Sequence, residues 1–479
     1  MKNNPCICGQ AFRPSLPDEL HEECGVVGIY GVKNAAQVAF MALQALQHRG
    51  QQGCGIATTG PDGKIRMHKK AGLVKDVFSD KELSLLPGDM GIGHVRYPTT
   101  DVGGMENIQP FCLTSKAGSF ALAHNGNIVN SKWVRDYLEA RGHLLHSTSD
   151  SELFAHLIGA GAPARGWAAN MGLAANQLDG AFSTVLLTRD KLFACRDKYG
   201  FRPLSLGRLE NGYVVASETC ALDTVGASFI RDIEPGELLT IGPEGVRSSF
   251  FSDMKGQKMC SMEYIYFARP DSVIEGCGVH TFRKRSGALL YQEHPTQADL
   301  VTCVPESGMS AAIGYAEASG IPLEMGLIKN TYVARTFIQP TQSLREIGVR
   351  MKLTPVRSIV KDRSVVVVDD SIVRGTTSRQ LVQMLRDAGA REVHMRIASP
   401  CYAWPCFYGI DTGTREQLIG ARLSEEEICR FIGADSLHYL SREALFTASG
   451  RTELCTACFD GRYPTHLYGL GGSWEEQDN

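Results

Sequence analysis

A run of four valines followed by two aspartates constrains the fold of this chain more than any other feature. Val365–Val368 form the run, and Asp369 and Asp370 come directly after it. A strand with one wet face alternates apolar and polar side chains, whereas a strand covered on both faces is apolar throughout. The run therefore predicts a central parallel strand with helices on both sides of its sheet.

The residues around this run continue the same pattern. A second apolar run, Asp299–Val304, precedes it, and Ser378–Ala388 follows with its apolar side chains on one side of a helix. Strand, loop and helix alternate, which predicts a doubly wound α/β domain. We place this domain at residues 256–479, after a polar linker around Ser252–Gln257.

Residues 24–255 have a different character. Short apolar strands separated by glycines begin at Gly25–Gly31, and Ala36, Phe40, Leu43 and Leu46 fall at helical spacing. This pattern predicts an α+β domain with antiparallel sheets. Residues 1–23 are polar, carry three prolines and lack periodicity, so we interpret them as a leader. Further strands are expected around Gly91–Arg96, Phe120–His124, Ser183–Thr188 and Tyr213–Ser217.

Charge and cysteine content narrow the function classes. A net charge of −3 argues against a nucleic-acid surface or a basic membrane patch. No run approaches the roughly 18 apolar residues of a membrane span, and no signal-peptide core is present, so we expect a cytoplasmic protein. Fifteen cysteines are many for a reducing compartment. We therefore expect them to serve as a nucleophile, as metal ligands or as small buried residues.

Cys24 opens a strand directly after the leader. If the leader were removed, Cys24 would carry both its thiol and a free α-amine, whose ordinary pKa is near 8. Such an amine could act as the base for its own thiol, as in N-terminal nucleophile catalysis. Taken alone, a buried strand cysteine is the commoner interpretation.

Three other segments carry groups suited to an amino-acid substrate. Arg96 and Thr99 could hold a carboxylate, Asn125 and Gly126 offer two donors for an oxyanion hole, and Asp150 could bind an ammonium group. Each has an ordinary alternative, namely a surface arginine, an Asn-Gly hairpin turn and a helix N-cap. One chain in which all three ordinary alternatives hold at once is much less common than a chain in which any one of them holds.

These segments resemble the class II glutamine amidotransferase domain in order and spacing. The resemblance implies an N-terminal-nucleophile αββα sandwich that hydrolyses glutamine through a thioester. It implies that Cys24 is the nucleophile, that Arg96 and Thr99 hold the α-carboxylate, that Asn125 and Gly126 form the oxyanion hole, and that Asp150 binds the α-amine. The segments are Cys24–Gly28, Leu46–Gln51, His94–Thr99, His124–Asn127 and Ser149–Glu152.

The segment Val365–Thr377 combines a strand, two carboxylates, a turn and a helix start. Backbone N–H groups around Gly375 and two threonine hydroxyls could cradle a phosphate at the helix N-terminus. No Walker-type string occurs, and an acidic turn with threonine capping is the alternative. The segment resembles the phosphoribosyl pyrophosphate motif of type I phosphoribosyltransferases. The implied roles are Asp369, Asp370 and Ser307 on Mg²⁺, the two aspartates also on the ribose hydroxyls, and Ser371, Arg374, Gly375, Thr376 and Thr377 on the 5′-phosphate.

A basic segment, Lys329–Lys352, lies between Ser307 and the Val365–Thr377 segment. It contains five basic residues and one acid, Glu346, which suits a lid over pyrophosphate or, from charge alone, a solvated loop. The basic residues are Lys329, Arg335, Arg345, Arg350 and Lys352.

Cys455 and Cys458 form a C-x-x-C pair, which by itself could be redox-active, zinc-binding or accidental. A glutaminase followed by a phosphoribosyltransferase resembles the amidophosphoribosyltransferase family, whose iron–sulfur branch has cysteines in segments similar to Met259–Tyr264 and Trp404–Asp411. The resemblance implies a [4Fe–4S] cluster, with zinc as the alternative. Its ligands would be Cys260, Cys406, Cys455 and Cys458, whereas Cys6, Cys8, Cys54, Cys277 and Cys401 are interpreted as packing or incidental thiols.

The family resemblance implies a complete reaction. Ammonia from glutamine would pass through an internal channel to phosphoribosyl pyrophosphate, giving 5-phosphoribosylamine, pyrophosphate and glutamate at the start of purine biosynthesis. It also implies removal of the leader, inhibition by purine nucleotides and a tetramer. Another class II amidotransferase would lack the Val365–Thr377 motif. A non-catalytic nucleotide- or oxygen-sensing relative would be expected to have lost Cys24, Asp369 or Asp370, which are all present.

Overall fold

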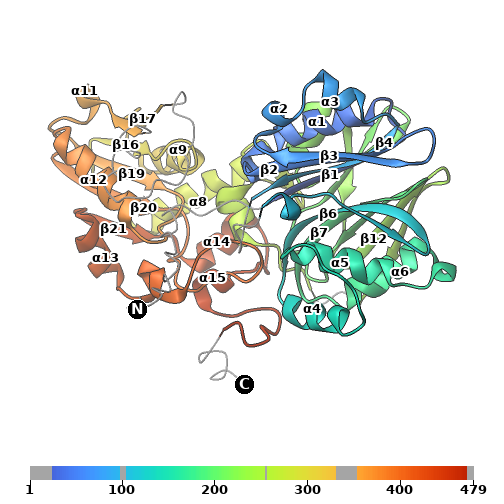
Figure 1. Ribbon diagram of the computed structural model, residues 1–479. Coiled ribbons are helices and arrows are strands. Elements are labelled where there is room, and N and C mark those ends of the chain that lie inside the picture. The colour runs from blue at the N-terminus through green and yellow to red at the C-terminus, as the bar shows by residue number, and fades with distance from the viewer. Residues whose placement is uncertain (1–23, 98–103, 254–255, 331–352, 472–479) are drawn as a thin grey trace, which may run out of the picture.

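The computed structural model describes residues 24–97, 104–253, 256–330 and 353–471 (Figure 1). The leader, Thr99 and most of the basic segment therefore lie outside the described residues. Two bodies lie beside each other, one built from the N-terminal half of the chain and one from the C-terminal half (Figure 1). Both parts match the architecture that the sequence predicted.

The first body contains a seven-stranded and a six-stranded sheet, both antiparallel. In pairing order the first sheet is β11 (Ser228–Asp232), β9 (Ser205–Leu209), β10 (Gly212–Ala216), β1 (Gly25–Tyr30), β4 (Met90–Arg96), β2 (Gly53–Thr59) and β3 (Ile65–Ala71). The second is β13 (Gly245–Phe250), β12 (Glu237–Gly242), β8 (Leu192–Arg196), β7 (Gly180–Leu187), β6 (Gly118–Ile128) and β5 (Phe111–Ser115).

Helices cover the outer face of each sheet, so the body has four layers (Figure 1). Strand β1 shows the cause: Val26 packs in the core between the sheets, whereas Val27 packs against the helices on the other side. The αββα sandwich is confirmed. Over the first sheet lie α1 (Ala35–Ala45), α2 (Val74–Val77), α3 (Asp80–Ser84) and α7 (Thr219–Val225), and over the second α4 (Ser131–Glu139), α5 (Asp150–Gly159) and α6 (Gly166–Asn176).

The second body has a parallel sheet of β16 (Leu300–Cys303), β19 (Ser364–Asp369), β20 (Glu392–Ile397) and β21 (Ser436–Tyr439). Val366 and Val368 pack toward α8 (Val279–Glu293), α9 (Met309–Ser319) and α14 (Arg442–Ser449). Val365 and Val367 pack toward α12 (Thr376–Asp387) and α13 (Glu425–Ile432) on the other face. The valine run is thus a doubly covered parallel strand, as predicted.

Shorter elements complete the second body. They are a π-helix (Glu263–Phe267), β14 (Val273–Ile274), β15 (Cys277–Gly278), β17 (Leu327–Lys329), β18 (Leu353–Pro355), α11 (Arg357–Val360) and α15 (Ala457–Asp460). One-turn 3₁₀ helices span Arg415–Gln417 and Ile419–Ala421 in this body, and Gln47–Arg49, Met105–Asn107 and Pro163–Arg165 in the first.

The two bodies share one small core. Val129, Ala181 and Phe201 of the first pack with residues of the second, and the Phe201 and Tyr408 rings stack with centroids 4.3 Å apart. The boundary at residue 255 is not tested by this packing and stays a prediction. Within the described ranges, no helix has the length and apolar character needed to cross a membrane. The cytoplasmic location stays a prediction. In the small core shared by the two bodies, the residues contributed by the second body are Tyr408, Cys455, Ala457 and Leu467.

Candidate active site

Cys24 lies immediately before β1, against the end of β4. Its Sγ is 3.5 Å from both the backbone oxygen and the backbone nitrogen of Tyr97. Burial raises the pKa of the Cys24 thiol, while the bond to Tyr97 and the charges of Arg96 and Arg49 act in the opposite direction. A thiol whose pKa is raised is mostly protonated at neutral pH, so it needs a nearby base to become a nucleophile.

Asn125 and Gly126 lie inside β6, where they pair with Ser183 and Phe182 of β7. The hairpin-turn alternative for this Asn-Gly pair is therefore wrong. The Asn125 side chain is fully buried, and neither of its polar atoms has a hydrogen-bond partner within the described part of the chain. Buried amides are nearly always satisfied, so this one is available to a ligand.

Gly126 is required at its position by the backbone. Its φ is +139°, and a Cβ there would lie 2.0 Å from the Ala181 carbonyl oxygen. Any side chain would therefore displace β7 from β6. The glycine keeps its N–H and the Asn125 amide in one short segment, the arrangement expected of an oxyanion hole.

Arg96 and Asp150 provide opposite charges near Cys24. Arg96 lowers the pKa of Cys24 and Asp150 raises it, so both charges act on the same thiol. Arg96 Nη1 donates to Gln52 Oε1 at 2.8 Å, and Asp150 Oδ2 accepts from the backbone N–H of Ile128 at 2.8 Å. A free amino acid carries one carboxylate and one ammonium group, which this pair of charges matches. Asp150 is also the first residue of α5, after the Ser149 N-cap.

Asn125→Ala tests the predicted oxyanion donor: we expect it to lower the predicted glutamine hydrolysis by about 100- to 1,000-fold, because removal of one oxyanion donor has that effect in other enzymes. KM for glutamine should change little, since the interaction strengthens in the transition state. Steady-state glutamate release measures both quantities.

Asn130→Ala is the matched control for this variant. Asn130 is also buried, but its amide already binds the Gln177 oxygen and the Asp179 N–H. It should therefore lower stability without a comparable loss of kcat. Equal kcat losses in both variants would remove Asn125 from the oxyanion hole.

The second candidate site lies at the carboxyl end of the parallel sheet, where open α/β folds bind ligands. Strand β19 ends at Asp369 and α12 begins at Thr376, with Gly375 at φ +79° between them. Arg374 Nη2 donates to Gln417 Oε1 at 3.2 Å. Thr376 and Thr377 occupy the first turn of α12, where N–H groups and the helix dipole favour a phosphate.

Asp370 is a buried carboxylate with spare binding capacity. Burial raises its pKa to about 6, against the effects of Ser307 and Arg283. Its Oδ1 accepts from Ser371 Oγ at 3.1 Å, whereas Oδ2 has no hydrogen-bond partner among the residues described. Asp370 and Ser307 line one pocket, although they lie 63 positions apart in the sequence. The Asp370 carboxylate and the Ser307 hydroxyl are oxygen ligands of the kind that a hard cation such as Mg²⁺ prefers.

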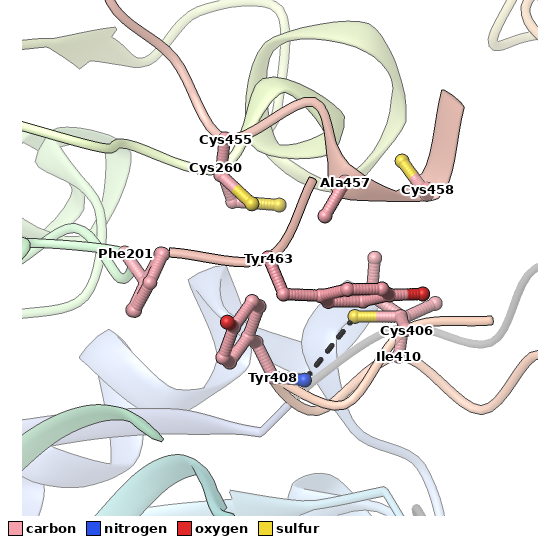
Figure 2. A pocket seen from close by; sticks show the side chains of 9 residues that line it. All are labelled: Phe201, Cys260, Cys406, Tyr408, Ile410, Cys455, Ala457, Cys458 and Tyr463. Carbon is pink, nitrogen blue, oxygen red and sulfur yellow. Dashed lines mark hydrogen bonds between the residues drawn. The ribbon is translucent and has the colours of Figure 1, made fainter. Parts of the chain in front are cut away.

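The four predicted cluster cysteines line a single cavity (Figure 2). They come from three separate segments, two of which are joined where Cys260 and Cys455 form a parallel bridge and Cys455 N–H donates to the Met259 oxygen at 2.8 Å. Tyr408 N–H donates to Cys406 Sγ at 3.3 Å. Phe201, Tyr408, Ile410, Ala457 and Tyr463 enclose the rest of the cavity. All thirteen described cysteines are free thiols.

Comparison with known proteins identifies the family. Residues 94–224 match a family model described as a glutamine amidotransferase domain. The chain is 52% identical to the amidophosphoribosyltransferase of Bacillus subtilis, over 94% of this chain and 95% of that protein. The chain belongs to the amidophosphoribosyltransferase family. It is 47% identical to the Methanocaldococcus jannaschii amidophosphoribosyltransferase over 93% of this chain and 98% of the other.

Two solved structures of the same family are similar to this chain in fold. The B. subtilis glutamine phosphoribosylpyrophosphate amidotransferase complexed with ADP and GMP has a TM-score of 0.87 and 51% identity, covering 94% of this chain and 99% of that one. A structure titled as the allosteric regulatory enzyme of purine biosynthesis has a TM-score of 0.88 and 51% identity, covering 94% and 97%. The chain is thus a glutamine amidotransferase and transferase of purine biosynthesis.

Sequence reasoning about this amidophosphoribosyltransferase family member missed two buried arginines. Arg49 donates from Nε to the Cys24 carbonyl oxygen at 3.2 Å, and Arg283 of α8 acts on the pKa of Asp370. Arg49 lies inside the matched segment Leu46–Gln51, which was the one available signal. Nothing in the local sequence distinguishes Arg283 from a surface arginine of an amphipathic helix.

Proposed function

We propose that this chain releases ammonia from glutamine at Cys24 and joins it to phosphoribosyl pyrophosphate, giving 5-phosphoribosylamine, pyrophosphate and glutamate. The proposal rests on three observations in one chain: Cys24 lies under the opposite charges of Arg96 and Asp150, the buried Asn125 amide has no partner among the described residues, and a carboxylate-and-threonine loop ends a parallel strand. Pyrophosphate release by anaerobically purified protein, with and without glutamine, tests it directly. Release that does not depend on either glutamine or ammonia would contradict it.

The glutamine half-reaction follows from the residues near Cys24. The Cys24 sulfur attacks the side-chain amide carbon, and the developing oxyanion accepts hydrogen bonds from the Asn125 side chain and the Gly126 N–H. Collapse expels ammonia and leaves a thioester, which water hydrolyses to glutamate. Arg96 and Thr99 would hold the substrate carboxylate, and Asp150 its ammonium group.

The base in this half-reaction is proposed to be the α-amine of Cys24, freed when residues 1–23 are removed. The raised pKa of the thiol supports a need for a base. An amide nitrogen cannot accept a proton at neutral pH, so the unprocessed chain should lack this route. Mass spectrometry of active enzyme should find Cys24 at its N-terminus, and full glutaminase activity from intact protein would contradict the amine-base proposal.

The transferase half-reaction joins ammonia to the anomeric carbon as pyrophosphate leaves. Asp369 and Asp370 would hold the ribose hydroxyls and, with Ser307, Mg²⁺. Ser371, Arg374, Gly375, Thr376 and Thr377 would hold the 5′-phosphate at the start of α12. When bound, Mg²⁺ neutralises charge on the leaving pyrophosphate.

The cysteine-lined cavity supports an iron–sulfur cluster over a single zinc ion. Zinc draws its sulfur ligands to about 2.3 Å from one centre. Within the described ranges, no group of three or more His, Cys, Asp or Glu side chains is placed so that it could hold a metal ion, whereas the four sulfurs line one enclosed space. A cluster separates its thiolates onto four irons, and it would also remove the penalty of burial that raises the pKa of Cys260 and Cys455 to about 12.

We expect Cys458→Ser to lose bound iron and acid-labile sulfide, and with them the visible absorption of the cluster. Its thermal midpoint should fall by several degrees, since loss of a structural metal site is a major destabilisation. Cys429→Ser, a half-buried thiol of α13 outside the cavity, is the control and should keep full iron content. Stoichiometric zinc in place of iron in the unchanged protein would contradict the cluster proposal.

Purine nucleotides are the proposed regulators. The B. subtilis relative was solved in complex with ADP and GMP, and this chain matches it over 94% of its length. We propose that the same nucleotide classes inhibit this enzyme, that it forms a tetramer, and that it works in the cytoplasm. Inhibition titrations with ADP and GMP, separately and together, test the first of these.

A further inference from the structure

Four charged side chains form a fully buried group between the two bodies. We call Arg49, Glu218, Arg202 and Glu263 the buried ion cluster, and each has a completely buried side chain. Arg49 Nη1 is 2.6 Å from Glu218 Oε1, and Arg49 Nη2 is 2.6 Å from Glu263 Oε1. Arg202 Nη1 lies 3.3 Å from Glu263 Oε1. Each charge is paired with an opposite one, as a buried ion group requires, and His48 Nε2 also lies 2.7 Å from Glu218 Oε1.

The buried ion cluster joins the glutamine site to the second body. At one end, Arg49 Nε donates to the carbonyl oxygen of Cys24 at 3.2 Å. At the other end, Glu263 begins the π-helix that follows Cys260, and Arg202 Nη2 donates to the Tyr408 carbonyl oxygen at 2.5 Å. One guanidinium thus contacts the backbone of Cys24 and a carboxylate of the other body.

A planar guanidinium transmits orientation because its five N–H donors are fixed relative to each other. Arg49 Nε donates to the Cys24 carbonyl oxygen, Nη1 donates to one oxygen each of Glu218 and Glu263, and Nη2 donates to the other Glu263 oxygen. Without the Glu263 charge, Glu218 would be the one carboxylate among the described residues left on the guanidinium, which could then rotate about that partner. Rotation would move Nε, and with it the Cys24 carbonyl that it holds.

We propose that Arg49 is a positioning residue for the Cys24 nucleophile and that Glu263 of the second body sets its orientation. Arg49 acts through the Cys24 backbone, which fixes the direction of both the thiol and the α-amine. The inference rests on the proposed role of Cys24. It makes the geometry of the glutamine site depend on the segment that also carries Cys260.

Labelling of Cys24 by a diazoketone analogue of glutamine tests the proposal in the full-length enzyme. Glu263→Gln removes the charge and keeps the shape of the side chain. We expect its maximal labelling rate, read by mass spectrometry, to fall on the order of tenfold to a hundredfold, because small misplacements of a reacting group have effects of that size. The half-saturating concentration should change by less than about twofold, since the glutamine contacts remain.

Glu275→Gln is the matched control. Glu275 is also buried and also joins two arginines, Arg196 of the first body at 2.6 Å and Arg451 of the second at 2.6 Å, but neither contacts Cys24. A general loosening between the bodies would slow labelling equally in both variants and overturn the proposal. Unchanged labelling in Glu263→Gln would overturn it as well.

Two further arms complete the test. If Glu263→Gln yields no folded protein, Glu263→Asp is measured instead. Its shorter side chain withdraws the carboxylate from the 2.6 Å contact with Arg49 Nη2, so the expected result and the overturning result are the same. Arg49→Lys keeps the charge but loses the Nε–H, and it should slow labelling to a similar extent. Failure of the unchanged enzyme to be labelled at Cys24 would instead contradict the proposed function itself.

Discussion

Cys24→Ala is expected to abolish synthesis from glutamine and to leave synthesis from added ammonia near its original rate. The variant lacks the only sulfur at the glutamine site that we assign as nucleophile, and loss of a nucleophile lowers kcat by at least about a thousandfold in comparable enzymes. The ammonia-dependent reaction needs only the second site. Phosphoribosylamine formation from each nitrogen source measures the two activities separately.

Cys54→Ala serves as the control for this variant. Cys54 is a buried thiol in β2 of the same sheet, and β2 pairs with β4 beside β1. It should retain both activities with some loss of stability. A folded Cys24→Ala enzyme that lost ammonia-dependent turnover too would show that the two sites do not divide the reaction as proposed.

Asp370→Asn should lower turnover by at least about a hundredfold with either nitrogen source, because both routes end at the phosphoribosyl site. Asparagine keeps the shape of the side chain and removes the charge that would face ribose and Mg²⁺. Among the described residues Asp370 Oδ2 has no hydrogen-bond partner, and it shares a pocket with Ser307, which is the reason to expect a direct contact with the ligand.

Asp387→Asn is the control for Asp370. Asp387 is an exposed aspartate at the end of α12, bound to Gln383 Nε2 at 2.8 Å. Pyrophosphate release should be unchanged in this variant. Full ammonia-dependent activity in Asp370→Asn would remove Asp370 from the site.

The sequence predicted those features whose cause is local. Four valines in a row can be buried on both faces only in a doubly covered strand, and β19 is one. Val26 and Val27, two consecutive apolar residues that point to opposite faces of β1, likewise indicate a strand buried on both sides. These patterns need no knowledge of which element packs on each face.

Features that depend on distant partners were beyond local reasoning. Asn125-Gly126 has the composition of a hairpin turn, and only its pairing with Ser183 and Phe182 decides that it is a strand segment. Apart from its place in the family-like segment Leu46–Gln51, nothing in the sequence distinguishes Arg49 from a surface arginine, because the two carboxylates that pair with it lie 169 and 214 positions away. The meeting of Asp370 with Ser307 was implied by family resemblance and not by the spacing of these residues.

The small core shared by Phe201 and Tyr408 limits how the polypeptide could be divided. A fragment ending near residue 253 would expose Val129, Ala181 and Phe201 to water, and the complementary fragment would expose its own half of the same contact. Exposed apolar surface of this kind promotes self-association. Separately expressed halves should therefore aggregate alone and become soluble when they are produced together, so the chain behaves as one cooperative unit although its two chemistries are distinct.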